Sequence, residues 1–459
     1  MKKLTVNICR LILAATFILS GFVKAVDPLG SQYKIEDYLQ AMNLGQLLPE
    51  WGVLVLSVGQ AAVEFCLGIF LLFAIRRRLT SKLVLIIMLV MTPLTLWLAI
   101  ANPISDCGCF GDALVLTNWQ TFWKNVALLV MAAIVAWKPL EMFRFVSKSN
   151  QWIVINYSAL FILGISAWSV YDLPQFDFRP YHVGASIREG MEVPEGAEQP
   201  QFETTFILEK NGEQREFTLD NYPDSTWTFV DSRTVQLSEG YVPPIHDFSM
   251  GLVPTDTAAS TEEEFPVMED IAAEVLADTS YTFLLVSPYL EDADDSRLDL
   301  INELYEYSLD QGYRFYCLTA SGNDGQQRWR NLTGAEYPFC LTDPITLKTM
   351  IRSNPGLMLL KDGRVVRKWS HNNLPQLDPE ETAMGLDRLE MGQMPKDTVA
   401  GKIVKILLGF VLPLLLLTIA DRLWMWTSWL RRKKKEKQQT TTLTTLNKEN
   451  DNEKENCSR

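Results

Sequence analysis

The chain is organised around the stretch Asp106-Cys107-Gly108-Cys109-Phe110-Gly111-Asp112, a short polar segment between two long apolar runs. One residue separates the two cysteines, which brings their Cα atoms near the range that a disulfide spans, and Gly108 permits the backbone angles of so tight a ring. A disulfide closed there would be strained, and strained disulfides exchange readily. We therefore expect Cys107 and Cys109 to be a catalytic redox pair. The alternative is a glycine turn in which the cysteines are small buried residues or one fixed disulfide.

Six apolar runs predict an integral membrane protein, because each is long enough to cross about 30 Å of hydrocarbon as a helix of about 20 residues. A signal peptide is the rival interpretation of the first run, but Arg10 and Lys24 lie within it and no small-residue cleavage site follows. Asn118 is the expected N-cap of the fourth span. An amphipathic surface helix is expected over residues 31–50. The six spans cover residues 4–26, 52–75, 82–101, 119–137, 152–170 and 401–420.

The distribution of positive charge predicts the orientation of the spans. Short connections rich in Lys and Arg stay in the cytoplasm, and here they are the N-terminus, residues 76–78, residues 138–148 and residues 431–435. Both termini are therefore expected to be cytoplasmic, and residues 172–400 to lie on the opposite side. The cysteine pair then also lies on the oxidising side, where disulfide chemistry is permitted.

Composition excludes several classes of function. The net charge is −13, and the acidic residues are concentrated between residues 171 and 400, so nucleic acid is not an expected partner. Seven cysteines are too few and too scattered for a disulfide scaffold, and three histidines leave little for a metal site, so no metal is expected. No cofactor is evident. A membrane quinone is a candidate electron acceptor for the cysteine pair.

Glu64 lies near the middle of the second span, where a carboxylate needs a partner or a proton. One alternative is an ion pair with Arg10 of the first span. The other is a Glu64 that stays protonated in the bundle interior or reaches a water-filled crevice. Lys24 and Asp27 are expected to pair with each other and with lipid head groups. A transporter that uses Glu64 is disfavoured, because inverted repeats and glycine-interrupted spans are not evident.

Residues 171–400 show two patterns. Alternating apolar and polar residues over about 183–250 predict a small antiparallel β unit. From about residue 271 strands alternate with helices: a buried strand over residues 281–286, a helix over 294–311, a strand over 313–318, and a hairpin over 358–366 turned by Asp362-Gly363. Cys317 and Cys340 are a candidate structural disulfide; buried free thiols or a second redox pair are the alternatives.

The membrane part resembles the DoxX-like and MauE (methylamine utilisation) membrane proteins. The resemblance rests on residues 10–30, on Glu64-Phe65-Cys66-Leu67-Gly68 and on the cysteine stretch, and it covers roughly residues 4–140. It implies a four-helix bundle in a bacterial inner membrane, associated with redox or disulfide maturation of exported proteins in the periplasm. Cys107 and Cys109 match the family's cysteine pair, and Lys24, Asp27 and Glu64 match its intramembrane polar positions.

Residues 270–375 resemble the thioredoxin fold in the order of their strands and helices. By this resemblance Pro355 of Asn354-Pro355-Gly356 takes the place of the cis-proline of thioredoxins. The place of the reactive C-x-x-C motif is taken by residues 287–292, which contain no cysteine. The lobe is therefore expected to be thioredoxin-like in fold without being a dithiol oxidoreductase by itself.

The expected fold class is multi-domain, an α-helical transmembrane bundle with an extracytoplasmic β unit and a thioredoxin-like α/β domain. Two functions are in competition: thiol–disulfide exchange with exported client proteins or periplasmic thiol proteins through Cys107 and Cys109, or a non-catalytic membrane-tethered binding and assembly factor. The expected division is 1–140 four-helix membrane domain, 141–171 fifth span, 172–253 β unit, 254–270 acidic linker, 271–378 thioredoxin-like domain, 379–400 linker, 401–424 sixth span, and 425–459 a basic, then disordered, cytoplasmic tail.

Overall fold

The computed structural model describes residues 2–45, 47–104, 106–198, 201–210, 213–218, 227–238, 240–253, 268–396 and 399–457. The chain forms two compact units, one made of Met1–Phe176 and Lys396–Arg459, the other of Asp177–Pro395.

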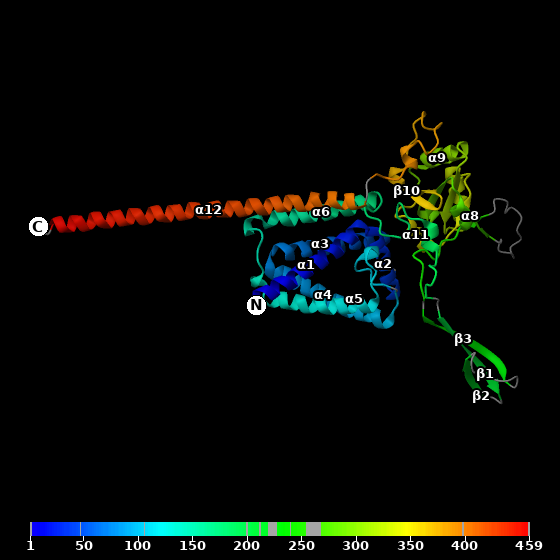
Figure 1. Cartoon of the computed structure of the whole chain (residues 1–459), viewed down its shortest axis with the longest axis horizontal. Coiled ribbons are helices and arrows are strands. Elements are labelled where there is room, and N and C mark those ends of the chain that lie inside the picture. The colour runs from blue at the N-terminus through cyan, green and yellow to red at the C-terminus, as the bar shows by residue number, and fades with distance from the viewer. Residues whose placement is uncertain are drawn as a thin grey trace. The chain divides into compact units, whose positions relative to one another are not determined.

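The first unit is helical (Figure 1). Within the described residues, six of its helices are long and apolar enough to cross a membrane, which confirms the six predicted spans. The helices are α1 (Lys2–Val26), α2 (Pro28–Ala41), α3 (Glu50–Phe73), α4 (Arg77–Ala101), α5 (Asn118–Trp137), α6 (Gln151–Tyr171) and α12 (Val399–Cys457), with single 3₁₀ turns at η1 (Gly111–Ala113), η2 (Pro139–Glu141) and η3 (Lys148–Asn150).

Helices α1 and α3 pack antiparallel at very short range. A Cβ atom added to Gly21 would lie 2.3 Å from the backbone nitrogen of Phe65, and one added to Gly68 would lie 2.7 Å from the backbone nitrogen of Ile18. Glycine is needed at both points because any side chain would push the two backbones apart. These contacts also fix the register of the two helices, in which residue 21 of α1 lies opposite residue 65 of α3.

Three helix boundaries differ from the sequence predictions. The surface helix α2 begins at Pro28, because Asp27 caps it by accepting a hydrogen bond from the Gly30 nitrogen (2.9 Å), and it ends at Ala41 rather than near residue 50. Helix α5 is capped by Thr117, not Asn118, in a capping box with Gln120. Helix α12 continues to Cys457, where a disordered tail was expected.

The second unit contains a seven-stranded sheet of order β10-β9-β6-β7-β8-β4-β5. Strands β6, β7 and β8 are parallel, and β9 and β10 form an antiparallel hairpin beside β6. The strands are β4 (Gly251–Leu252), β5 (Glu269–Asp270), β6 (Tyr281–Ser287), β7 (Arg314–Thr319), β8 (Phe339–Leu341), β9 (Gly356–Lys361) and β10 (Arg364–Ser370). The Asn354–Pro355 peptide bond, directly before β9, is cis, as expected.

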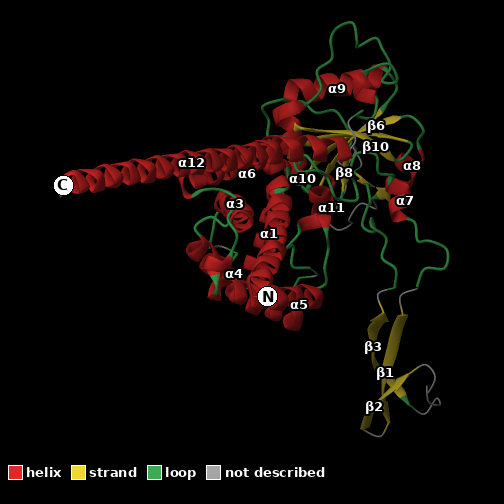
Figure 2. Ribbon diagram, turned by 60° about the vertical axis from the view of Figure 1, so that its left-hand side comes forward, coloured by secondary structure: helices red, strands yellow, loops and turns green. Residues whose placement is uncertain are grey.

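Helices cover both faces of this sheet, and Figure 2 shows α9 and α11 on opposite sides of it. The face that carries Phe283, Phe315 and Cys317 packs against α9 and against Trp329 of α10. Central parallel strands followed by an antiparallel hairpin with a cis-proline at its start are the thioredoxin-like arrangement that the sequence predicted. The helices are α7 (Ile187–Met191), α8 (Ala272–Ala277), α9 (Leu298–Asp310), α10 (Asn323–Thr333) and α11 (Pro344–Met350), with 3₁₀ turns η6 (Leu290–Asp292), η7 (His371–Asn373) and η8 (Glu390–Gly392).

The boundaries of this lobe differ from the predicted ones. Leu386, Leu389 and Met391 are buried in its core, so the first half of the predicted 379–400 linker belongs to the folded lobe. The predicted antiparallel β unit is present as β1 (Gln201–Lys210), β2 (Glu213–Thr218) and β3 (Thr228–Ser238), in the order β2-β1-β3. Most of the predicted acidic linker, residues 254–267, lies outside the described residues.

Candidate functional site

The cysteine loop connects α4 to α5 and is held in place by short-range hydrogen bonds. The Gly108 nitrogen donates to Asp106 Oδ1 (2.8 Å), and the Gly111 nitrogen donates to the Gly108 carbonyl (3.1 Å). Gly108 has a φ of +63°, which other residues rarely adopt. Its missing side chain also leaves room for Lys34, whose Cγ would lie 3.2 Å from an added Cβ. The backbone conformation therefore favours glycine between the cysteines, and a larger residue would also have to displace the Lys34 side chain slightly.

The two thiols face each other, with their Sγ atoms 3.0 Å apart. Cys107 is buried and Cys109 is half-buried. Tyr38 of α2 donates a hydrogen bond to the Cys107 carbonyl (2.7 Å), and the Ser20 hydroxyl of α1 lies 2.7 Å from the Cys109 carbonyl. Side chains from two other helices thus anchor the loop that carries the pair, as expected for a built site rather than a loose turn.

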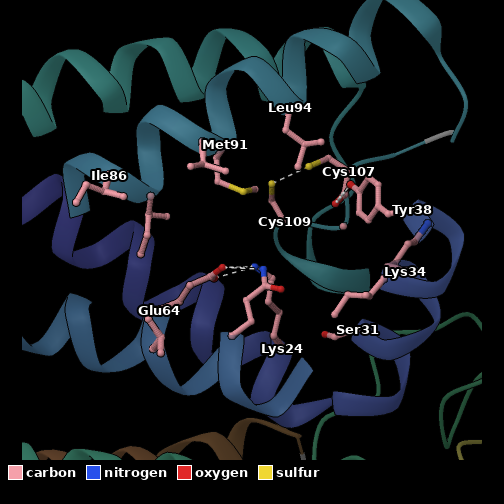
Figure 3. A pocket seen from close by; sticks show the side chains of 16 residues that line it. Lys24, Ser31, Lys34, Tyr38, Glu64, Ile86, Met91, Leu94, Cys107 and Cys109 are labelled. Carbon is pink, nitrogen blue, oxygen red and sulfur yellow. Dashed lines mark hydrogen bonds and ion pairs between the residues drawn. The ribbon is translucent and has the colours of Figure 1, made fainter. Parts of the chain in front are cut away.

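Lys24 and Glu64 form a buried ion pair beside this loop (Figure 3). Lys24 Nζ lies 2.7 Å and 2.8 Å from the two carboxylate oxygens of Glu64, and the side chains are 8% and 12% exposed. Gln60 donates to the same carboxylate (3.0 Å), and Ser20 Oγ lies 2.7 Å from it. Since Ser20 has one hydroxyl proton, it serves either Glu64 or the Cys109 carbonyl at a given moment. Ser20 therefore connects the ion pair to the cysteine loop.

The predicted Arg10–Glu64 pair is wrong, and so is the predicted Lys24–Asp27 pair. The α1–α3 register places Glu64 at the level of residues 20–24 of α1. Arg10 lies about a dozen residues nearer the N-terminus of α1, roughly 18 Å from that level at 1.5 Å per residue. Arg10 instead donates to the Phe143 carbonyl (2.6 Å) and lies over the Phe145 ring. Asp27 caps α2. Of the four predicted intramembrane polar residues, Lys24 and Glu64 adjoin the cysteine pair, whereas Arg10 and Asp27 contact other parts of the bundle.

Positive charge surrounds the thiols. The pKa of Cys109 is lowered to about 6, first by the hydrogen bond with the Cys107 thiol and then by the charges of Lys124 and Lys24, which together outweigh the effect of burial. The pKa of Cys107 is raised by the same hydrogen bond and by burial. A flanking carboxylate such as Asp106 would by its negative charge raise the pKa of a thiol. Asp106, however, is paired with Lys34 of α2 (2.8 Å), and Lys124 lies over the Phe110 ring (4.3 Å).

A cavity of about 380 Å³ opens next to the sulfur atoms. One wall consists of apolar side chains of α4, and the opposite wall contains Lys24, Gln60 and Glu64. A second cavity of about 50 Å³ lies on the other side of Cys109, towards Lys124. Met91, Lys24, Glu64 and Cys109 line both cavities. Of the two cysteines, Cys109 lines both cavities and Cys107 lines only the larger one. The apolar wall is made of Ile86, Ile87, Val90, Met91 and Leu94.

Sequence reasoning missed the residues that complete this site, Ser20, Lys34, Tyr38 and Lys124. Ser20 precedes Lys24 by one helical turn, which is the one local signal that places it on the same face of α1. Lys34 and Tyr38 share a face of α2 for the same reason. Their approach to the cysteines depends on how α2 folds against the bundle, which no local pattern reveals.

The predicted Cys317–Cys340 disulfide is not formed. In the parallel pair β7–β8, Cys317 lies opposite Phe339 and Cys340 lies opposite Leu318. This offset of one residue directs the two side chains to opposite faces of the sheet. Both are buried free thiols, the alternative that the sequence left open.

The thioredoxin-like lobe has polar side chains where thioredoxins have cysteines. Ser287 donates to Asn354 Oδ1 (2.6 Å), and the Asn354 amide donates to the Tyr289 carbonyl (2.9 Å). These bonds join the end of β6 to the cis-proline segment. Nearby, His371 Nδ1 lies 2.9 Å from Ser353 Oγ, and its Nε2 lies 3.9 Å from Asp294. Ser353 also donates to the Pro355 carbonyl (2.6 Å), so this cluster supports the turn.

Comparison with known proteins gives partial matches. Residues 2–138 match the family "Methylamine utilisation protein MauE", and residues 202–239 match a domain of unknown function (DUF8463). No curated protein matches the chain. Among solved structures, "Solution structure of a putative protein disulfide isomerase from Bacteroides thetaiotaomicron" is 13% identical over 28% of this chain and 76% of that chain, with a TM-score of 0.21. Residues 2–138, which carry the cysteine pair, the Lys24–Glu64 pair and both cavities, are thus a membrane region of the MauE family.

Proposed function

We propose that Cys107 and Cys109 exchange disulfides with thiols of exported proteins at the outer face of a bacterial inner membrane. The observation that carries the proposal is the pair itself, with its sulfurs 3.0 Å apart and both cysteines lining a cavity. The charges of the short connections support an outward-facing loop and cytoplasmic termini. Membership of residues 2–138 in the MauE family is in keeping with a redox role.

The surroundings of the sulfurs suggest a role for each. In the oxidised pair, a client thiolate attacks Cys107, the S–S bond breaks, and Cys109 leaves as a thiolate beside Lys24 and Lys124. The sulfur whose thiol has the lower pKa is the better leaving group. A second client thiol then loses its proton to water and attacks the client sulfur of the mixed disulfide. Cys107 leaves and takes up a proton, so the client gains a disulfide and this pair becomes a dithiol.

Trapping of mixed disulfides tests the proposal. In native membranes, the Cys109→Ser variant should accumulate mixed disulfides through the reverse reaction, in which Cys107 attacks a client disulfide and Cys109, which would displace the client again, is missing. The Cys107→Ser/Cys109→Ser double variant should accumulate none. Cys317→Ser is the matched control, since this fully buried thiol lies in the other unit and should leave the adducts unchanged. If Cys107 and Cys109 of the unmodified chain stay reduced and inert to oxidants, the proposal is refuted.

One observation favours a second candidate, a tethered factor that binds clients without chemistry. Tyr289 is 40% exposed next to the cis-proline segment, at the position where thioredoxins have their reactive cysteines. An exposed aromatic side chain beside a backbone edge is typical of a peptide-binding surface. The double serine variant separates the two functions. Full retention of the cellular phenotype supports binding, and its loss at normal expression supports exchange.

A further inference from the structure

We infer that the cavity of about 380 Å³ beside Cys109 binds a lipophilic quinone, which reoxidises the Cys107–Cys109 dithiol. This inference rests on the proposed function, since it names the acceptor for the electrons that thiol exchange leaves on the pair. The volume lies in the range of roughly 300–1,000 Å³ that is typical of small-molecule sites.

The walls of the cavity select a lipid-soluble occupant. Its apolar side is formed by α4 between Ile86 and Leu94, in the middle of a membrane span. Ile86 and Val90 of α4 and Val63 of α3 line the cavity and are 55%, 63% and 52% exposed. Because these side chains lie at the level of the hydrocarbon, their exposed surface faces lipid. A molecule can therefore enter from the bilayer without crossing water.

The opposite side of the cavity suits a molecule with two carbonyl oxygens. Gln60 contributes an amide and Lys34 an ammonium group, and each carries more N–H donors than its bond to Glu64 or Asp106 uses. Lys24 lines the same cavity, as do both cysteines. A hydrocarbon chain offers no acceptor to their remaining N–H donors, whereas a quinone ring can accept hydrogen bonds from them.

The redox step balances with a quinone and with no further reactant. Cys107 thiol and Cys109 thiolate give one S–S bond and two electrons, and the quinone takes both electrons and two protons to become a quinol. One proton comes from the Cys107 thiol. The second is taken up from water, in place of the proton that Cys109 released to water earlier, and it reaches the ring through the Lys24–Glu64 pair, which lines the cavity.

Reduced full-length protein in lipid nanodiscs, mixed with decylubiquinone, tests the inference. One quinol should form for each Cys107–Cys109 disulfide, with the disulfide measured by alkylation and mass spectrometry. Met91 lines the cavity, so the larger side chain of Met91→Trp should fill it. We expect this variant to form quinol about tenfold more slowly or worse, which corresponds to an overpacking cost of a kcal/mol or two. Leu89→Trp is the matched control, because Leu89 is exposed on the same helix outside the cavity, and should keep the rate.

A second measurement uses the unmodified chain and guards against a Met91→Trp variant that fails to fold. A photoreactive azidoquinone should label α4 near Met91, and decylubiquinone should compete with it. Equal rates for both tryptophan variants, or labelling spread over all helices, would overturn the inference. A third outcome separates the inference from the proposed function. If decylubiquinone does not oxidise the pair, but the chemically oxidised pair still oxidises one dithiol peptide per molecule, the quinone inference is overturned and the proposed function stands. If the oxidised pair does not react with the peptide either, the proposed function fails.

Discussion

Removal of Lys24 or Glu64 should destabilise the membrane unit strongly, because each leaves a buried charge without its partner. The two side chains are 8% and 12% exposed and 2.7 Å apart. Breaking such a pair costs about 3–5 kcal/mol, more than the pair contributes relative to well-packed apolar residues. We expect Lys24→Met and Glu64→Gln each to lower the free energy of unfolding by an amount near this range, with the amide at the lower end because Gln60 and Ser20 can still hydrogen-bond to it.

A double-mutant cycle distinguishes this ion pair from the Arg10–Glu64 pair. Lys24→Met combined with Glu64→Gln should be less destabilising than the sum of the single changes by about 0.5–3 kcal/mol, the range for residues in contact. Arg10→Met combined with Glu64→Gln should be additive within about 0.5 kcal/mol, because these residues lie far apart along α1 and α3. Unfolding in mixed micelles, followed by circular dichroism, measures all five variants. Coupling of Glu64 to Arg10, with none to Lys24, would refute the α1–α3 register described above.

Three further predictions concern the thiols. The rate of Cys109 alkylation by iodoacetamide should rise with pH, with a midpoint near pH 6, and level off above it, because the pKa of Cys109 is lowered to about 6. Cys107→Ala removes the hydrogen bond to the Cys109 sulfur and should move this midpoint to higher pH. A pH profile that Cys107→Ala leaves unchanged contradicts this prediction. Gly108→Ala, at φ +63°, should cost about 1–2 kcal/mol and speed alkylation of Cys107. Gly59→Ala, inside helix α3 with open space around it, should not lower the stability and should leave the alkylation of Cys107 unchanged. Cys317 and Cys340 should both be alkylated after unfolding without reductant, and a Cys317–Cys340 peptide in the digest would refute the β7–β8 register.

The sequence was sufficient for features that depend on one segment. Each span is visible because about 20 apolar residues in a row are typical of a membrane-spanning helix. The cis bond at Pro355 was expected from the resemblance of this segment to thioredoxins. The sequence was insufficient where two segments must be aligned. The partner of Glu64 depends on the glycines that bring α1 against α3. Likewise, a single-residue offset between β7 and β8 separates Cys317 from Cys340.

Composition led to a wrong prediction in two segments, the predicted linker after residue 378 and the predicted disordered tail after residue 425. The stretch after residue 378 contains turn residues and looks like a linker, yet Leu386, Leu389 and Met391 are buried in the core of the thioredoxin-like lobe. The tail after residue 425 is polar, which favours disorder, but it contains neither glycine nor proline, so nothing local ends the helix that begins in the membrane. Polarity alone thus predicts exposure better than it predicts the end of a helix.

The contacts around Cys109 link its reactivity to the stability of the bundle. Lys24 holds α1 to α3 through Glu64, and the same ammonium group lowers the pKa of Cys109. Ser20 contacts both the Glu64 carboxylate and the Cys109 carbonyl. A change that loosens the α1–α3 contact must therefore also alter the thiolate, even where it lies far from the sulfur atoms. Variants that affect exchange can for this reason be assigned to chemistry only when the free energy of unfolding is measured on the same protein.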